Sequence, residues 1–242
     1  MRILIPLGIV VFSALICGLF QLSLGSLLLL YHSSLGRHIR KKTKSLASSF
    51  IAGVCLMIFL LLATSCFINI ALINGNAELS SNDIFFFSIS IGILCSTAIV
   101  IWFFYYRSGR SKRDSTELWL PKPISHFISS RASTTNNNSE AFALGLLTAL
   151  GEIPFTFILF ILAGNAILEL TESYETIALS LFSIASVLPL LILRWMIRSG
   201  KTVVEIQRWR VRNKTFFRIF TGFCFVVLAI FIFTFKILGV AL

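Results

Sequence analysis

Charged side chains are scarce in this sequence. Only 13% of its 242 residues are Asp, Glu, Lys or Arg, against roughly 25% in soluble globular proteins. Hydrophobic residues make up 57%, and the mean hydropathy is +0.91. A soluble fold would have too little polar surface to cover such a core. The composition therefore excludes a soluble domain and indicates an integral membrane protein.

The motifs of common enzymes are also missing. The sequence contains no nucleophile elbow, no P-loop, no HExxH and no CxxC pair. Its cysteines all fall in apolar stretches, as is typical of inert buried thiols: Cys17, Cys55, Cys66, Cys95 and Cys224. No Cys/His cluster suggests a metal site. We therefore expect neither an enzyme nor a bound cofactor or metal.

Six apolar stretches are long enough to cross the hydrocarbon, which takes about 20 residues in a helix. They are too long and too uniform for barrel strands, and backbone groups in lipid must be satisfied within the segment. We therefore predict an all-α, polytopic membrane protein with six transmembrane helices, at about 5–32, 46–72, 84–106, 141–168, 176–198 and 216–241. No A-x-A-like cleavage site follows the first stretch, so we expect it to be a retained helix and not a signal peptide.

The net charge of +11 comes from alternate loops. Of the 21 Lys and Arg, five lie between Gly36 and Ser45, six between Arg107 and Arg131, and eight between Arg194 and Arg218. The second and fourth connections carry none. The positive-inside rule then places loops one, three and five in the cytoplasm and both termini outside the cytoplasmic membrane. We expect these loops to meet anionic lipid headgroups, and we expect no nucleic-acid binding.

The basic and polar segment 107–139 is the one long linker, and its composition is typical of a mobile cytoplasmic segment. It divides the chain into two membrane regions, 1–106 and 140–242, with three predicted helices each. Because three is odd, the second region enters the membrane inverted relative to the first. The sequence thus predicts a 3+3 inverted repeat.

Each predicted half opens with a span that helix-breaking residues interrupt. The first break is at Gly25 in "QLSLGS", and the second is at Gly151 and Pro154 in "TALGEIP". Corresponding breaks in inverted halves point to the central site of a transporter. The alternative is that Gly and Pro are simply commoner in membrane helices than in soluble ones.

Glu152 lies inside the second break, roughly 16 Å into its span at 1.5 Å per residue. An ionised carboxylate near the midplane costs about 2.5–3.5 kcal/mol on insertion scales, so the neutral acid is favoured. Gly151 and Pro154 leave backbone carbonyls unpaired beside it. We predict a site for a proton or cation here. The alternative is a neutral, structural Glu152 that a hydroxyl such as that of Ser23 or Thr148 satisfies.

Other polar residues in apolar sequence complete the predicted binding set. They are Gln21, Ser23 and Ser26 around the first break, Thr148 before Glu152, and Asn165 further along the same span. Towards the outer end of the last span, Lys236 is placed to meet Glu169 or Glu172. Segment 203–211 mixes apolar and basic residues, which predicts a short amphipathic helix at the cytoplasmic surface.

The stretches "FQLSLGSLLLLYHSSLGR" (20–37) and "ALGEIPF" (149–155) resemble motifs of the lysine-exporter superfamily, which includes the membrane domain of thiol-disulfide carriers of cytochrome c biogenesis. The resemblance implies six spans in a 3+3 inverted repeat, with breaks near the midplane. The carriers' paired cysteines would fall near Ser26 and Glu152, and neither is cysteine. Disulfide transfer is therefore not implied, and the usual prolines of the first motif are also absent.

From these observations we predict a transporter or exporter of a small solute or ion, coupled to protons through Glu152. The alternative is a non-enzymatic scaffold or partner subunit that uses its basic cytoplasmic loops. The sequence leaves open whether the chain acts alone, as a homo-oligomer or with a membrane partner.

Overall fold

The computed structural model describes residues 3–24, 40–75, 83–105, 127–128, 130–132, 134–135, 137–199 and 202–239. Across these ranges the backbone is helical almost throughout and forms no strand, so the predicted all-α class is confirmed there. Five helices are long and apolar enough to cross a membrane, and a sixth span results if one bent helix pair is counted together. This is the architecture of a multi-pass membrane protein.

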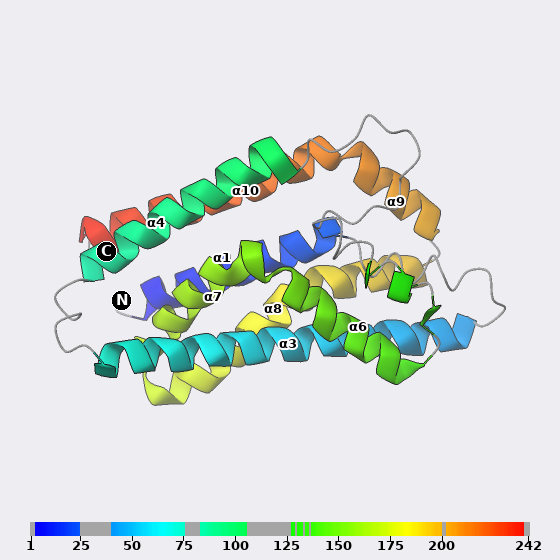
Figure 1. Cartoon of the computed structure of the whole chain (residues 1–242), viewed down its shortest axis with the longest axis horizontal. Helices are drawn as coiled ribbons and strands as arrows, with labels where there is room; N and C mark the ends of the chain where they lie inside the picture. Colours follow the sequence, from blue (N-terminus) through cyan, green and yellow to red (C-terminus); the bar gives the residue numbers. More distant parts are fainter. Residues whose placement is uncertain are drawn as a thin grey trace.

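The first half of the chain contains α1 (Leu4–Leu24), α3 (Arg40–Gly75), α4 (Asp83–Val100) and the π-helical turn η2 (Ile101–Tyr105). The second half contains α6 (Asn138–Gly151), α7 (Ile153–Leu168), α8 (Glu172–Arg198), α9 (Val203–Arg212), α10 (Lys214–Ile232) and the π-helical turn η3 (Phe233–Ile237). In Figure 1, α4 and α10 lie side by side along one edge of the molecule, and α3 runs along the opposite edge.

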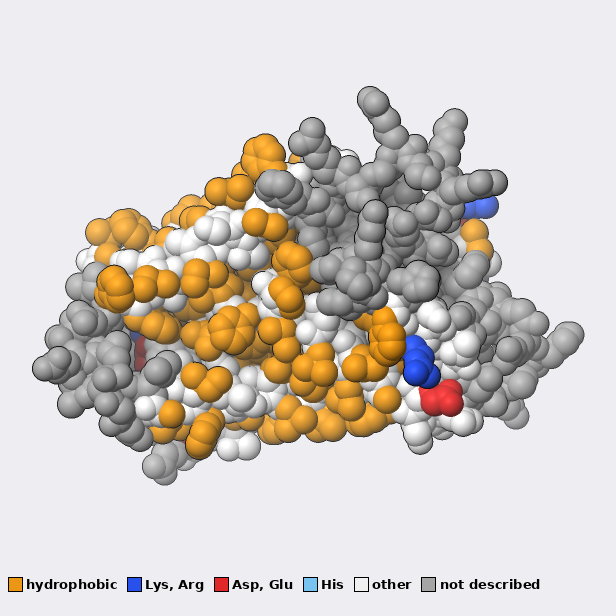
Figure 2. All heavy atoms as spheres, viewed as in Figure 1, with side chains coloured by type: hydrophobic (Ala, Val, Ile, Leu, Met, Phe, Trp, Pro, Cys, Tyr) orange, Lys and Arg blue, Asp and Glu red, His pale blue; other side chains and the backbone are white. Residues whose placement is uncertain are grey.

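The surface of the described helices is largely apolar. Hydrophobic side chains spread across the middle of the face in Figure 2, while charged groups appear towards its ends. α4 is the least covered of the candidate spans, with only 28% of its apolar window buried inside the protein. Side chains such as Phe85 and Ile99 are therefore placed to face lipid.

α3 holds both halves of the bent pair α6–α7. It meets α6 at Gly53 and Gly145, where each glycine lies against the backbone of the other helix and leaves no room for a Cβ atom. Further along α3, Ser65 Oγ donates to the Phe160 carbonyl at 2.8 Å, and Asn69 Nδ2 donates to the Ile161 carbonyl at 3.1 Å. Small residues and interhelical hydrogen bonds are the usual means of holding membrane helices together.

A second close crossing joins α1 to α8. A Cβ atom at Gly18 would lie 2.8 Å from the Ser186 carbonyl oxygen and 3.0 Å from Pro189 Cδ. Pro189 lies inside α8 and has no N–H, so the carbonyl of Ala185 loses its usual helical donor. The crossing therefore brings α1 next to an irregular stretch of α8.

α4 and α10 form a pair that contacts the rest of the bundle less closely. The Trp102 indole of η2 lies on Gly222 of α10, which leaves no space for a side chain there. At the other end, Lys236 Nζ lies 5.3 Å from the centroid of the Phe87 ring. It also donates to Glu169 Oε1 at 2.6 Å, and this confirms the predicted pairing of Lys236 with Glu169.

Two loop regions, residues 203–212 and the described end of the linker, contain helix. Residues 203–212 do form a helix, α9, and a capping box of Thr202 and Glu205 fixes its start. The predicted linker is described only from residue 127 onwards. Its described residues after 127 are mostly helical, and Ile128 and Ala132 are buried there, because short apolar side chains between polar ones can still pack on the bundle.

Candidate functional site

The predicted break in the fourth span is present, and it falls at Glu152. α6 ends at Gly151, α7 begins at Ile153, and the two axes differ by 80°. Pro154 sits in the first turn of α7, where its missing N–H leaves the Leu150 carbonyl without a helical donor. A glycine before the corner and a proline after it thus explain why one apolar stretch becomes two helices.

The backbone of Glu152 is well satisfied at this corner. Its N–H donates to the Ala149 carbonyl at 3.2 Å. Its carbonyl accepts from the N–H groups of Phe155 and Thr156 at 3.0 and 3.1 Å, and from Thr156 Oγ1 at 3.0 Å. The Glu152 backbone at the break is therefore fully hydrogen-bonded, and only the Glu152 side chain has an unusual environment.

The Glu152 side chain points into the bundle, with an exposure of only 2%. Gln21 of α1, equally buried, faces the Glu152 carboxyl group. The pair does not reach hydrogen-bond geometry, and Glu152 Oε1 and both Gln21 amide atoms lack a hydrogen-bond partner in the described part of the chain. Buried polar groups are normally paired, so this group of unpaired ones makes the corner the candidate site.

Two further buried residues belong to the same place. Cys17 lies one turn before Gln21 on α1 and is near Glu152. Ser186 of α8 approaches the Cys17 thiol, and its own Oγ has no partner among the described residues. We call Cys17, Gln21, Glu152 and Ser186 the central cluster. It brings side chains of α1 and α8 together with the carboxyl group of the α6–α7 corner.

The two cluster residues of α1 lie on a single polar stripe of that helix. Ser13, Cys17 and Gln21 are four residues apart, which places them on one face of a helix. All three are buried, and the Ser13 hydroxyl is likewise unpaired within the described ranges. α1 packs mainly on α7 and α8.

Other predicted site residues have different positions. Thr148 is buried, but its hydroxyl donates to the Leu144 carbonyl of its own helix at 2.8 Å, so it does not serve Glu152. Asn165 is half-buried on α7 and lies about 20 Å beyond Glu152 along that helix at 1.5 Å per residue, outside the cluster. Ser23 belongs to the last turn of α1, whereas Gly25 and Ser26 lie outside the described residues.

Sequence reasoning missed Cys17, Ser186 and Ser13. The spacing of four between Ser13, Cys17 and Gln21 was a usable signal, because it predicts a common helix face. Ser186 carried a weaker one, since it lies one turn before Pro189 in the fifth span. Their approach to Glu152 depends on how α1 crosses α7 and α8, which no local pattern encodes.

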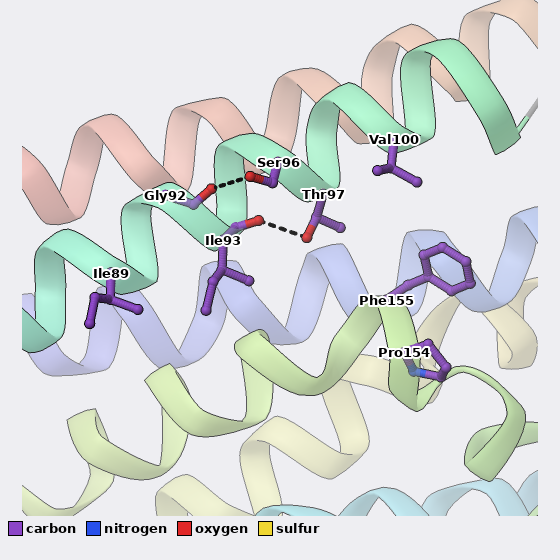
Figure 3. Close-up of a pocket in the computed structure, with 8 residues that line it drawn as sticks. All are labelled: Ile89, Gly92, Ile93, Ser96, Thr97, Val100, Pro154 and Phe155. Carbon is purple, nitrogen blue, oxygen red and sulfur yellow. Dashed lines mark hydrogen bonds between the residues drawn. The ribbon is translucent and has the colours of Figure 1, made fainter.

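A groove of about 320 Å³ lies on the other side of the corner, between α4 and the start of α7 (Figure 3). Pro154 and Phe155 line one wall, and α4 residues between Ile89 and Val100 line the other. Ser96 and Thr97 face the groove but donate to carbonyls of their own helix, at 2.7 and 2.8 Å. The groove is therefore effectively apolar.

Within the described ranges, no three His, Cys, Asp or Glu side chains come together in a group able to hold a metal ion. Comparisons with protein-family models, curated proteins and solved structures find no match. The chemistry of the central cluster, one carboxyl group with amide, thiol and hydroxyl neighbours, suits the binding of a proton or a single cation.

Proposed function

We propose that the chain is a six-span membrane transporter built as a 3+3 inverted repeat. Close crossings in equivalent places support this arrangement. The first span of each half lies against the second span of the other half, through Gly18 on α8 and Gly145 on α3. The third span of each half ends in a π-helical turn, η2 or η3, an irregularity that is rare elsewhere and common at functional sites.

The proposed orientation follows the charge of the loops. The basic loops, with α9, lie in the cytoplasm of the cell membrane and contact anionic headgroups, and both termini lie outside. The ion pair of Lys236 and Glu169 then marks the extracytoplasmic end. Arg194, whose guanidinium donates to Ser48 Oγ at 2.8 Å, lies towards the opposite end.

The transported species is a small solute or ion, and its movement is coupled to protons at Glu152. The observation that carries this proposal is the buried Glu152 carboxyl group at a helix corner, whose Oε1 has no hydrogen-bond partner in the described part of the chain and lies near other unpaired polar groups. Keeping such a set unpaired costs free energy that a purely structural residue would not need to spend. Glu152 would bind a cation after losing its proton, and would regain a proton after releasing the cation. Each exchange would give the carboxyl group a binding partner.

The proposed mechanism is alternating access. α3 fixes α6 and α7 through Gly53, Ser65 and Asn69, so the corner at Glu152 stays in place while surrounding helices move. The carboxyl group is neutral when it is closed off from water, because the ionised form is costly there. It ionises when water or a cation reaches it from one side.

Glu152→Gln tests the proposal, because glutamine keeps the shape of the neutral acid but cannot exchange a proton. We expect the purified variant to keep wild-type melting behaviour and to lose proton-coupled flux in liposomes that contain a pH-sensitive dye. Glu175→Gln, at the start of α8, is the matched control and should behave as wild type. Normal flux in Glu152→Gln would remove Glu152 from the mechanism.

A relationship to the lysine-exporter superfamily remains part of the proposal. Its support is the corner in "ALGEIPF", at the position of that family's second motif. The cluster has a single cysteine, Cys17, in place of a redox pair, so the proposal does not include disulfide transfer.

The scaffold alternative rests on α9. Val204 and Trp209 are exposed on this helix although Ile206 is buried, and exposed apolar groups beside Arg208 and Arg212 suit a protein partner as well as lipid. Replacement of Val204 and Trp209 by serine should leave flux intact if the chain is a transporter. A scaffold would instead lose its partner in co-purification and tolerate Glu152→Gln in every assay.

A further inference from the structure

One aromatic contact connects the groove between α4 and α7 with α1, the helix that carries Cys17 and Gln21. Phe155 lines the groove, and Figure 3 shows its ring directed from the start of α7 into the gap towards α4. On the other side it meets Phe20 of α1, with ring centroids 5.4 Å apart. Phe20 immediately precedes Gln21, whose amide faces Glu152.

The two sides differ in chemistry. The groove is apolar and open, and a Cβ atom at Gly92 would have nothing within 4 Å. The cluster is closed and polar, with Glu152 and Gln21 each only 2% exposed. A ligand that uses both sides therefore needs an apolar body of modest size and a compact head that a carboxylate attracts.

We infer that a small amphiphilic cation, such as an alkylammonium ion, enters along the α4–α7 groove and reaches Glu152 by displacing the Phe20–Phe155 ring contact. The inference rests on the proposed function in that it names the substrate class of the same site. Charge complementarity supports this occupant, since the acid at the end of the route is the only acidic side chain of the cluster. Binding of the ammonium head expels the carboxyl proton, so charge is conserved in the exchange.

Phe155 is the residue that separates the two spaces. A ring contact of this kind contributes about 0.5–1.5 kcal/mol beyond its buried area. In the proposed route, rotation of the Phe155 side chain joins the groove to the cluster. Glu152 is then reached from the hydrocarbon side of the protein.

Dicyclohexylcarbodiimide is a suitable probe because it is apolar and modifies neutral carboxyl groups. The carboxyl oxygen adds to its central carbon as the proton passes to nitrogen, and an acyl shift then gives a stable N-acylurea. We expect Phe155→Ala to label at Glu152 about two- to tenfold faster than wild type, the range that a ring contact implies. Phe157→Ala, on the exposed side of the same helix, is the matched control and should label at the wild-type rate.

Three further measurements complete the test, all read by mass spectrometry of the intact purified protein. Phe155→Leu keeps most of the volume and should label at an intermediate rate, even if the alanine variant folds poorly. Gly92→Phe, which fills the groove, should slow labelling. Octylammonium should protect Glu152 from the carbodiimide, whereas octanol should not.

Equal labelling of Phe155→Leu and wild type would overturn the route, and equal protection by octanol and octylammonium would overturn the cationic occupant. The labelling requires no transport. A Glu152→Gln variant with normal flux would therefore remove the proposed function and leave the route standing, whereas unchanged labelling in the Phe155 variants would do the reverse.

Discussion

Gly53 and Gly145 lie on the two sides of the crossing of α3 and α6, each against the backbone of the other helix, and neither position has room for a single additional carbon. A Cβ atom at Gly53 would overlap the carbonyl oxygen of Phe142, and one at Gly145 would overlap that of Phe50. Both obstacles are backbone atoms, which cannot move aside as a flexible side chain would. The position of α6, and with it the corner at Glu152, therefore requires glycine, which has no Cβ atom, at both positions.

Gly145→Ala should destabilise the protein by about 1–3 kcal/mol, the usual cost of overpacking a close contact. Thermal unfolding in detergent measures this change as a lower melting temperature. Gly92→Ala is the control, because that glycine has open space around it and alanine favours the helix. A Gly145→Ala variant that melts like wild type would show that α3 and α6 can separate at no cost.

Ser65→Ala should remove the hydrogen bond to the Phe160 carbonyl and lower stability by about 0.6 kcal/mol, the average for such bonds between membrane helices. Ser96→Ala removes a hydroxyl that bonds only within its own helix, so it should change stability less. Both variants can be compared by equilibrium unfolding. Equal effects would mean that the bond from α3 to α7 contributes nothing specific.

The pair of Lys236 and Glu169 should contribute no more than about 1 kcal/mol, because partly exposed ion pairs are weakened by solvent and salt. The two side chains are 18% and 33% exposed. A double-mutant cycle with Lys236→Gln and Glu169→Gln isolates the coupling between them. Added salt should reduce that coupling, and a salt-independent value would indicate a more buried pair than the structure describes.

The orientation can be tested by thiol labelling in whole cells, after the five native cysteines have been replaced. Single cysteines at Lys42, Lys112 and Lys201 should resist a membrane-impermeant reagent, because the positive-inside rule places them in the cytoplasm. A cysteine at Asn76 should react. The opposite pattern would invert the proposed topology.

The helical class and the corner at Glu152 were predictable because they follow from local chemistry. Long apolar runs can be satisfied in lipid only as helices, and Gly151 and Pro154 act on the residues next to them. The pairing of Lys236 with Glu169 was also accessible, since both lie near predicted helix ends on the same side of the membrane. These features need no knowledge of how the helices cross.

The composition of the central cluster was not predictable in the same way. Cys17 and Ser186 come together near Glu152 only because α1 crosses α8 at Gly18, a contact with Ser186, which is far away in the sequence. Asn165 is a polar residue of the same predicted span, but helix geometry places it well past the corner. Tertiary packing, not composition, decides which polar side chains meet.

The corner at Glu152 also has a consequence for how the chain enters the membrane. α6 and α7 meet the length and hydropathy requirements for a span only when taken together, and the acid between them adds about 2.5–3.5 kcal/mol to the cost of insertion near the midplane. We therefore expect residues 138–168 to insert into the membrane less favourably than the other predicted spans. α3, synthesised earlier, offers this segment a glycine crossing and two hydrogen-bonding side chains within the bilayer. We therefore expect membrane integration of residues 138–168 to be more efficient when α3 is already in place.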